Sequence, residues 1–322
     1  MRSILRQLAI ALALLWVVLS LTFFLVRAAP GDPATFLAPP AASAAELVRL
    51  RASLDLDAPL VVQYGRWARD VFKGNLGTSF VARRPVTRVL GDAIPISLAL
   101  GGISLVLTFL IGVSIGGVQG AHRGTRADTA LTLATTTVYA APSFWLALSL
   151  IALFTYGAAR LGFPALLRLP AFGVRDPAGN SGFADLVRHA VLPVLTLTLV
   201  GAAGIARYAR SSAVELLRTQ WVRTAIAKGV PARAVHARHV LANALPTLFV
   251  LFALALPGVL AGSVFVETVF GWPGVGRLMV SSIFARDYPV VVGATVVYAA
   301  LVIVANLAAD LALPLVDPRR RT

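Results

Sequence analysis

Six long apolar runs divide this sequence, and they constrain its fold more than any other feature. They cover residues 8–26, 97–119, 129–156, 190–206, 247–266 and 289–313. A helix that crosses a membrane needs about 20 mostly apolar residues, and each run approaches that length without an interior Lys or Arg. We therefore predict an all-α, polytopic membrane protein with six transmembrane helices, the third of them kinked at Pro142. The composition agrees, because 58% of the side chains are hydrophobic and only 13% are charged, against about a quarter in soluble proteins.

The basic residues between the runs predict the orientation. The segments on the side of the two termini, which include residues 207–246, hold Lys and Arg at about twice the density of residues 27–96, 157–189 and 267–288. By the positive-inside rule we place both termini and residues 207–246 in the cytoplasm, with the helices in the plasma (inner) membrane. The net charge of +15 is spread between apolar runs, so it predicts contact with lipid headgroups and no binding of nucleic acid.

The outer segment 27–96 carries helix signals of its own. Ser43 and Glu46 form a capping-box pattern ahead of a short helix, and Pro59 opens a second helix that ends near Gly74. One face of this second helix is apolar: Leu60, Tyr64, Trp67, Ala68, Val71 and Phe72. The stripe favours packing within the same chain, with a partner or the membrane surface as alternatives. Since there are no repeats and no low-complexity linkers, the sequence predicts one domain over residues 1–322.

The residues that bind ATP phosphates are missing from the sequence. A phosphate-binding loop reads G-x-x-x-x-G-K-S/T, and neither Lys73 nor Lys228 stands in such a motif. The chain has no cysteine, which excludes disulfides and thiolate metal sites. His236 and His239 share a helix face, but no Asp or Glu follows nearby to complete a metal site. We therefore expect no ATPase site, no metal and no cofactor in this chain.

Two polar positions inside apolar runs leave other functions open. Gly112, Ser114 and Gly116 spell G-x-S-x-G, which would suit an intramembrane serine hydrolase that uses Ser114. We favour helix packing through the three small residues, with the Ser114 hydroxyl bonded within or between helices. Asp310 is an acidic residue inside an apolar run, which would suit an ion-coupled secondary transporter. The alternative is a carboxylate paired near the inner end of its helix.

Residues 207–246 separate the fourth and fifth runs and are rich in Ala, Arg and Leu. The first of two predicted helices extends from about Ser212 to Lys228. Gly229 can close it in a left-handed conformation, and Pro231 opens the second helix. The pattern predicts a rigid, protruding turn between two short helices.

The amino-acid sequence of this loop resembles that of a known family. The stretch WVRTAIAKGVPARAVHARHVLANALPT at residues 221–247 is similar to the EAA loop of binding-protein-dependent ABC importer permeases, in the peptide and nickel branch. Other stretches resemble the same branch: PGDP at 30–33, LDLDAPLVVQYGRWARDVFKGNLGTS at 54–79, APSFW at 141–145, VFGWPGVGRL at 269–278 and DPRRR at 317–321. The resemblance covers nearly the whole chain and implies the type I importer permease fold.

The resemblance also implies a function and partners. The chain would be a transport subunit and not an enzyme, importing a peptide or similar small solute with ATP hydrolysed by others. Its partners would be a second homologous permease, two cytoplasmic ABC ATPases, an extracytoplasmic solute-binding protein and membrane lipid. The EAA loop would supply a helix that couples to one ATPase, through Arg223, Thr224, Ala225, Lys228, Gly229, His239 and Asn243. Ala225 and Gly229 would be its small positions, and Arg223, Lys228, His239 and Asn243 its polar contacts or caps.

Overall fold

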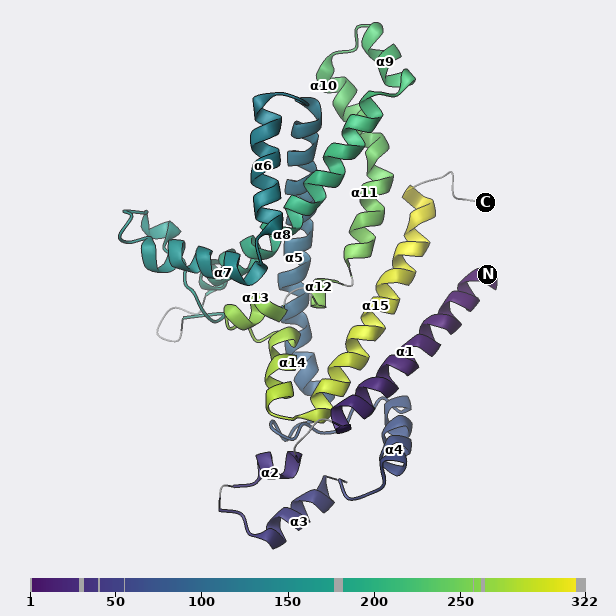
Figure 1. The fold of residues 1–322 in the computed structure, drawn as a ribbon, viewed down its shortest axis with the longest axis vertical. Coiled ribbons are helices and arrows are strands. Elements are labelled where there is room, and N and C mark those ends of the chain that lie inside the picture. Colours follow the sequence, from purple (N-terminus) through teal and green to yellow (C-terminus); the bar gives the residue numbers. More distant parts are fainter. Residues whose placement is uncertain are drawn as a thin grey trace. The chain divides into compact units, whose positions relative to one another are not determined.

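The fold is helical throughout the part of the chain that the structure, a computed structural model, describes (Figure 1). The described residues are 2–28, 32–39, 41–54, 56–176, 182–256, 258–261 and 264–316. Within them, five helices are long and apolar enough to cross a membrane, and one bent helix pair would make a sixth span. This confirms the predicted all-α membrane protein.

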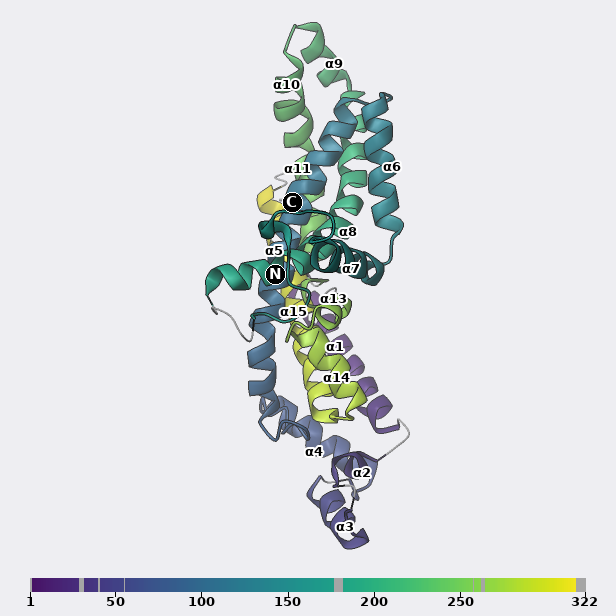
Figure 2. The same ribbon diagram turned by 90° about the vertical axis from the view of Figure 1, so that its left-hand side faces the viewer.

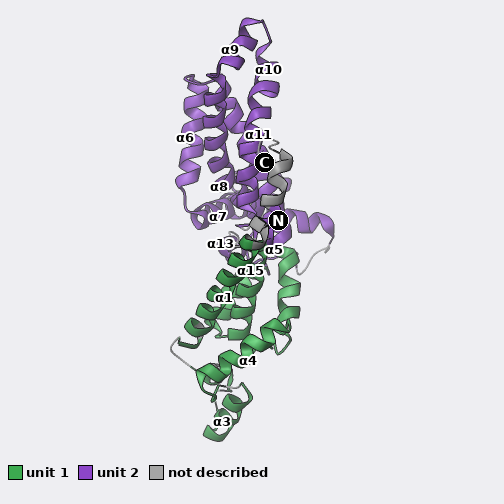
Figure 3. Ribbon diagram, turned by 90° about the vertical axis from the view of Figure 1, so that its right-hand side faces the viewer, with its two compact units in different colours: residues 1–96, 274–303 green, residues 97–273, 304–322 purple. Residues whose placement is uncertain are grey.

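The chain divides into two compact units, shown in Figure 3. Unit 1 contains residues 1–96 and 274–303, and unit 2 contains residues 97–273 and 304–322. The helices that begin in unit 1 are α1 (Arg2–Ala28), α2 (Pro33–Leu37), α3 (Ala44–Ser53), α4 (Leu60–Phe72), α5 (Val86–Ala121), α14 (Val275–Phe284) and α15 (Tyr288–Val316). Both α5 and α15 continue into unit 2.

Helices α3 and α4 form where the sequence predicts them. Ser43 and Glu46 make both bonds of the capping box at the start of α3. Part of the apolar stripe of α4 packs on α1, as the sequence favours: Tyr64 and Trp67 are half-buried, whereas Leu60 and Phe72 remain exposed. Trp16 of α1 stacks on Trp67 and Phe72 with ring centroids 5.9 and 4.8 Å apart. The hydroxyls of Ser20 and Tyr64 lie 2.7 Å apart.

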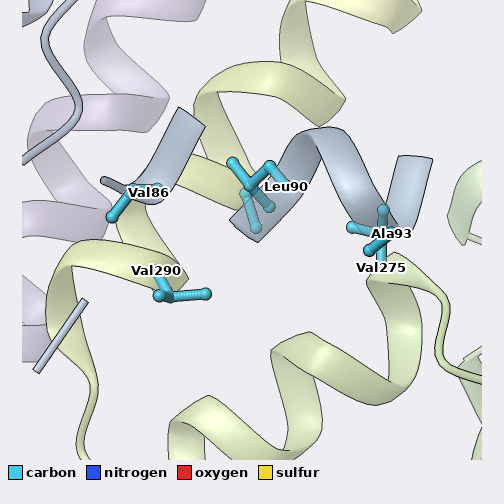
Figure 4. Close-up of a cluster of buried hydrophobic side chains, with 6 residues drawn as sticks. Val86, Leu90, Ala93, Val275 and Val290 are labelled. Carbon is cyan, nitrogen blue, oxygen red and sulfur yellow. The ribbon is translucent and has the colours of Figure 1, made fainter. Parts of the chain in front are cut away.

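Unit 1 has an apolar core where the start of α5 meets α14 and α15 (Figure 4). Val86, Leu90 and Val290 are almost completely buried there. Beside the core, the carboxylate of Asp287 accepts hydrogen bonds from the Ser79 hydroxyl at 2.5 Å and the Phe80 amide at 3.0 Å. This buried carboxylate holds the turn that precedes α5 against the turn that precedes α15.

Unit 2 contains the remaining helices. They are α6 (Arg126–Ala140), α7 (Ser143–Ile151) with a π-helical extension (Ala152–Gly157), the 3-10 turn η2 (Ala165–Leu167), α8 (Phe183–Leu217), α9 (Gln220–Ala227), α10 (Ala232–Ala234), the π-helix η3 (Val235–Leu241), α11 (Ala242–Ala255), α12 (Gly258–Ala261) and α13 (Val264–Val269). In Figures 1 and 2, α9 and α10 lie at the end of unit 2 where α5 turns into α6.

The third predicted span, residues 129–156, is not one kinked helix. Helices α6 and α7 meet at an angle of 103°. Ala141 has an extended conformation between them, because a residue before proline is pushed out of the helical region. Pro142 therefore starts a new helix instead of bending an existing one.

The fourth and fifth spans also differ from their predicted bounds. Helix α8 starts before residue 190 and continues past 206, since Arg is a good helix former and an apolar run measures only the lipid-facing part of a helix. The fifth span covers Ala232–Ala255 instead of 247–266. It includes Pro246 in its interior. The sequence has Pro257 and Gly258 where this helix is interrupted, and both residue types interrupt helices.

Candidate functional site

The turn between α9 and α10 is closed by backbone hydrogen bonds at Gly229. Gly229 has a φ of 80°, a left-handed conformation that costs a residue with a β-carbon about 1–2 kcal/mol. Its amide donates to the Ile226 carbonyl at 2.9 Å, and the Val230 amide donates to the Ala225 carbonyl at 3.2 Å. These are the two bonds of a Schellman motif. The sequence therefore ends α9 sharply and reverses the chain into Pro231, the N-cap of α10.

One side chain holds α9 on the protein. Val222 is completely buried, and it lies on the face of α9 turned toward α8 and η3. Trp221 lies at the edge of this contact, with its ring centroid 6.1 Å from that of His239. Because α9 has only eight residues, this single buried valine and the Schellman motif fix its position.

Most of the remaining surface of α9 is open. Arg223, Thr224 and Lys228 are exposed, Ala225 is half-buried, and Ile226 exposes 53% of its surface. The surface is therefore a short helix with two cationic side chains and a large apolar one beside them. A helix of this kind can dock into a cleft of another protein through both charge and apolar contact.

The remaining residues predicted for the loop lie on the next helix. The side-chain Nδ2 of Asn243 donates to the His239 carbonyl at 2.7 Å. Both residues therefore stabilise the helical stretch that follows Pro231, and His239 also lies beside Trp221 of α9. The first predicted loop helix, from Ser212 to Lys228, is wrong in its start: residues up to Leu217 belong to α8, and α9 begins at Gln220 after the Thr219 N-cap.

Gly112 and Gly116 lie against α8, whereas Ser114 does not. A β-carbon on Gly112 would be 2.8 Å from the Ala202 carbonyl oxygen. One on Gly116 would collide with the backbone of α8 at Ala206. Ser114 is exposed, and its hydroxyl donates to the Leu110 carbonyl of its own helix at 2.7 Å. At about 100° per residue, Ser114 points away from the face that the two glycines share, so of the two expected bonding modes its hydroxyl shows the one within its own helix.

The alternative functions gain no support from the described residues. No histidine is described near the Ser114 hydroxyl, which is bonded to its own helix. No group of three His, Cys, Asp or Glu residues in the described part is arranged to hold a metal ion. The side chain of Asp310 and residues 317–322 lie outside the described residues.

Two buried polar contacts in unit 2 escaped the sequence-based reasoning. Asp128 of α6 is paired with Arg210 of α8, and Glu267 of α13 accepts a hydrogen bond from the Ser97 hydroxyl at 2.6 Å. Asp128 and Arg210 stand just beyond the ends of apolar runs, where charged residues are expected anyway. The signal that could have found the pair is one acidic and one basic residue at matching ends of neighbouring spans.

Two family matches together cover the chain. Residues 91–322 match the family described as binding-protein-dependent transport system inner membrane component. Residues 1–101 match the N-terminal region of the binding-protein-dependent transport system membrane component.

Relatives of similar length are named as peptide permeases. The chain is 34% identical to the oligopeptide transport system permease protein AppB of Bacillus subtilis, with 98% of each chain covered. It is 36% identical to a putative peptide permease protein of Brucella ovis, covering 99% of this chain and 98% of the relative. It is 37% identical to the probable D,D-dipeptide transport system permease protein DdpB of Escherichia coli, covering 98% and 97%. Among solved structures, an amino acid ABC transporter crystallised with histidines has a TM-score of 0.48 at 16% identity, covering 72% of this chain and 94% of that one.

Proposed function

The chain belongs to the family of binding-protein-dependent transport system inner membrane components, and from this premise we propose that it forms half of the pathway through which a peptide is imported. It is a permease subunit of an ATP-driven importer of the inner membrane. The peptide cargo is inferred from the relatives, which are named as oligopeptide and dipeptide permeases over nearly their full length.

The ATPase partners are proposed from a motif that this chain lacks, and the other partners from its family. It has no phosphate-binding loop, so we assign ATP hydrolysis to two cytoplasmic ATPase subunits. A second homologous permease completes the pathway, and an extracytoplasmic solute-binding protein delivers the peptide. Both termini and residues 207–246 face the cytoplasm in this proposal. Single cysteines at Ala232 and Ala52 of this cysteine-free chain test it: an impermeant thiol reagent applied to intact cells labels only the second, and the reverse result contradicts it.

The observation that carries the coupling role is the open face of α9. The Schellman motif and Val222 fix α9 at the end of unit 2, while Arg223, Thr224 and Lys228 remain exposed. Exposed cations on a rigid helix attract a partner with an acidic cleft and fix its orientation. Cations on a mobile loop would do this less well, because the loop must first become ordered. We assign these residues to ATPase contact, Ala225 and Gly229 to the close turn, and His239 and Asn243 to its support.

Reversing one charge on this face tests the assignment. Arg223→Glu should lower co-purification of the ATPase subunits, and with it ATP-driven peptide uptake in reconstituted vesicles, by about tenfold. The matched control is Arg69→Glu on the exposed face of α4, which reverses an equivalent helix-surface charge in unit 1. Equal ATPase recovery in the two variants would contradict the assignment of α9.

A further inference from the structure

An ion pair between the buried Asp128 and the half-buried Arg210 joins α6 to α8 inside unit 2. Asp128 is 3% exposed, and its two carboxylate oxygens accept separate hydrogen bonds from the Arg210 Nε and Nη2 atoms, both at 2.8 Å. The paired, planar geometry allows one relative orientation of the two side chains. A buried carboxylate held in this way fixes both the distance and the rotation between the two helices.

The same carboxylate organises the turn that leads from α5 into α6. The Gly124 amide donates to Asp128 at 3.0 Å, and the Thr132 hydroxyl donates to it at 3.3 Å. Thr132 in turn accepts a hydrogen bond from the buried Gln119 of α5 at 3.2 Å. A continuous set of polar contacts therefore connects α5, α6 and α8.

Helix α5 touches α8 at the level of the ion pair. A β-carbon on Gly116 would lie 2.9 Å from the Arg210 amide nitrogen, and one on Gly120 would lie 2.6 Å from the Ala213 β-carbon. This glycine face brings the two backbones together with no room for a side chain. On another side, Ala209 and Leu248 pack α8 against α11.

Arg210 is also close to the loop along the chain. Helix α8 continues without interruption from Arg210 to its C-cap at Arg218, and the N-cap of α9 follows at Thr219. Two helical turns therefore separate the ion pair from α9. A displacement of α9 reaches Arg210 through the hydrogen-bonded turn at Arg218 and Thr219 and then along α8.

We propose that Asp128 and Arg210 are positioning residues for coupling: their ion pair makes α6 move with α9 when an ATPase pulls on the loop. An apolar contact at this place would let α8 slide or rotate past α6, because apolar contacts are not directional. The bidentate pair resists both movements. This inference rests on the proposed role of α9.

The experiment compares variants that remove the link with and without leaving an unpaired charge. Asp128→Asn and Arg210→Lys each break the bidentate geometry. The double variant Asp128→Asn with Arg210→Met also removes the guanidinium charge that Asp128→Asn alone leaves unpaired. Asp92→Asn is the matched control, because Asp92 pairs with Arg84 at 2.7 Å but both side chains are exposed.

The quantity measured is peptide imported per ATP hydrolysed by the assembled complex in vesicles, together with complex yield and thermal stability. We expect the ratio to fall about five- to tenfold in the double variant and in Arg210→Lys, with ATPase recruitment unchanged and with normal yield in the double variant. Asp92→Asn should keep the wild-type ratio. If the ratio stays at the wild-type value in every variant that assembles, and only yield or stability changes, the pair is merely structural and the inference is overturned.

Measuring the same ratio in Gly229→Leu distinguishes a failure of the ion-pair proposal from a failure of the proposed role of α9. Uncoupling by Gly229→Leu together with a wild-type ratio in Arg210→Lys would reject the ion pair's role alone. A wild-type ratio in Gly229→Leu would reject the assignment of α9 and this inference with it.

Discussion

Helix α4 in unit 1 and helix α9 in unit 2 end in the same way but lie in different surroundings. A lysine and a glycine follow the last turn of each, and Gly74 and Gly229 have φ angles of 76° and 80°. In α4 the Gly74 amide donates to the Val71 carbonyl and the Asn75 amide to the Asp70 carbonyl, both at 2.9 Å. The corresponding two bonds, at Gly229 and Val230, close α9.

The two helices differ in what their side chains contact. On α4, Trp67 packs against Trp16 and Phe23 of α1 and is half-buried, although Phe72 remains exposed. Helix α9 buries Val222, half-buries Ala225 and exposes its other side chains. A Schellman motif read from the sequence therefore predicts backbone geometry equally well in both places and says nothing about function. Because the backbone cost of replacing either glycine is the same, a difference between the two replacements reports on their surroundings.

The largest expected difference comes from Gly229→Leu compared with Gly74→Leu. Both variants force a β-carbon into a left-handed conformation at a cost of about 1–2 kcal/mol, and neither position has an atom within 4 Å of the new β-carbon. We expect Gly229→Leu to lose at least about tenfold in ATP-driven uptake, because a bulky residue blocks docking of the turn. Gly74→Leu should retain most uptake.

Uptake and solute-stimulated ATP hydrolysis in vesicles measure this difference, with complex yield as the control for folding. A loss of the same size in both variants would show that backbone strain alone matters, and the comparison would then carry no information about α9.

A smaller difference is expected when the buried contact of each helix is truncated. Trp67→Ala should weaken the attachment of α4 to α1 by about 2 kcal/mol, since half-buried apolar surface is lost. Val222→Ala should weaken the attachment of α9 by about 1 kcal/mol. Hydrogen exchange of residues 60–74 and 220–230 should increase in the first and second variant, respectively. Only Val222→Ala should also lower stimulated ATP hydrolysis, and lowered stimulation in Trp67→Ala would break the distinction.

The smallest effect is expected for asparagine, which tolerates the left-handed conformation. Gly74→Asn should be close to wild type in yield and uptake. Gly229→Asn should recover most of the uptake lost in Gly229→Leu if the turn geometry is what the ATPase requires. Uptake as low as in the leucine variant would instead show that the partner's backbone approaches Gly229 closely.

The sequence predicted local features of this fold better than the lengths of its helices. Ser43 and Glu46 cap α3, and Gly229 and Pro231 bound the turn after α9, because each signal acts through neighbouring backbone groups. The ends of α8 and the start of the fifth span were missed, since alanine and arginine continue a helix beyond its apolar part. Pro142 predicts an irregularity in the third span, but the 103° angle between α6 and α7 depends on what α7 packs against, which the sequence does not state.

The candidate site was predictable to a similar extent. The positions of Arg223, Thr224 and Gly229 on one short helix and its cap follow from spacing in the sequence. That Ser114 faces away from Gly112 and Gly116 follows from helical periodicity and could have been foreseen. Asp128 and Arg210 are 82 residues apart in the sequence. The packing of α6 on α8 brings them together, and the sequence does not predict that packing.

The length of α8 has a consequence for the lipid environment. Its 35 residues extend about 52 Å at about 1.5 Å per residue, whereas a bilayer with its headgroups is about 40–45 Å thick. Residues 207–217 continue about 16 Å past the apolar run, so the cap at Thr219 stands clear of the headgroup layer. A bilayer a few ångström thicker or thinner changes how much of α8 is immersed without drawing α9 into the lipid. We therefore expect α8 to absorb hydrophobic mismatch, and the proposed docking surface on α9 to stay in water.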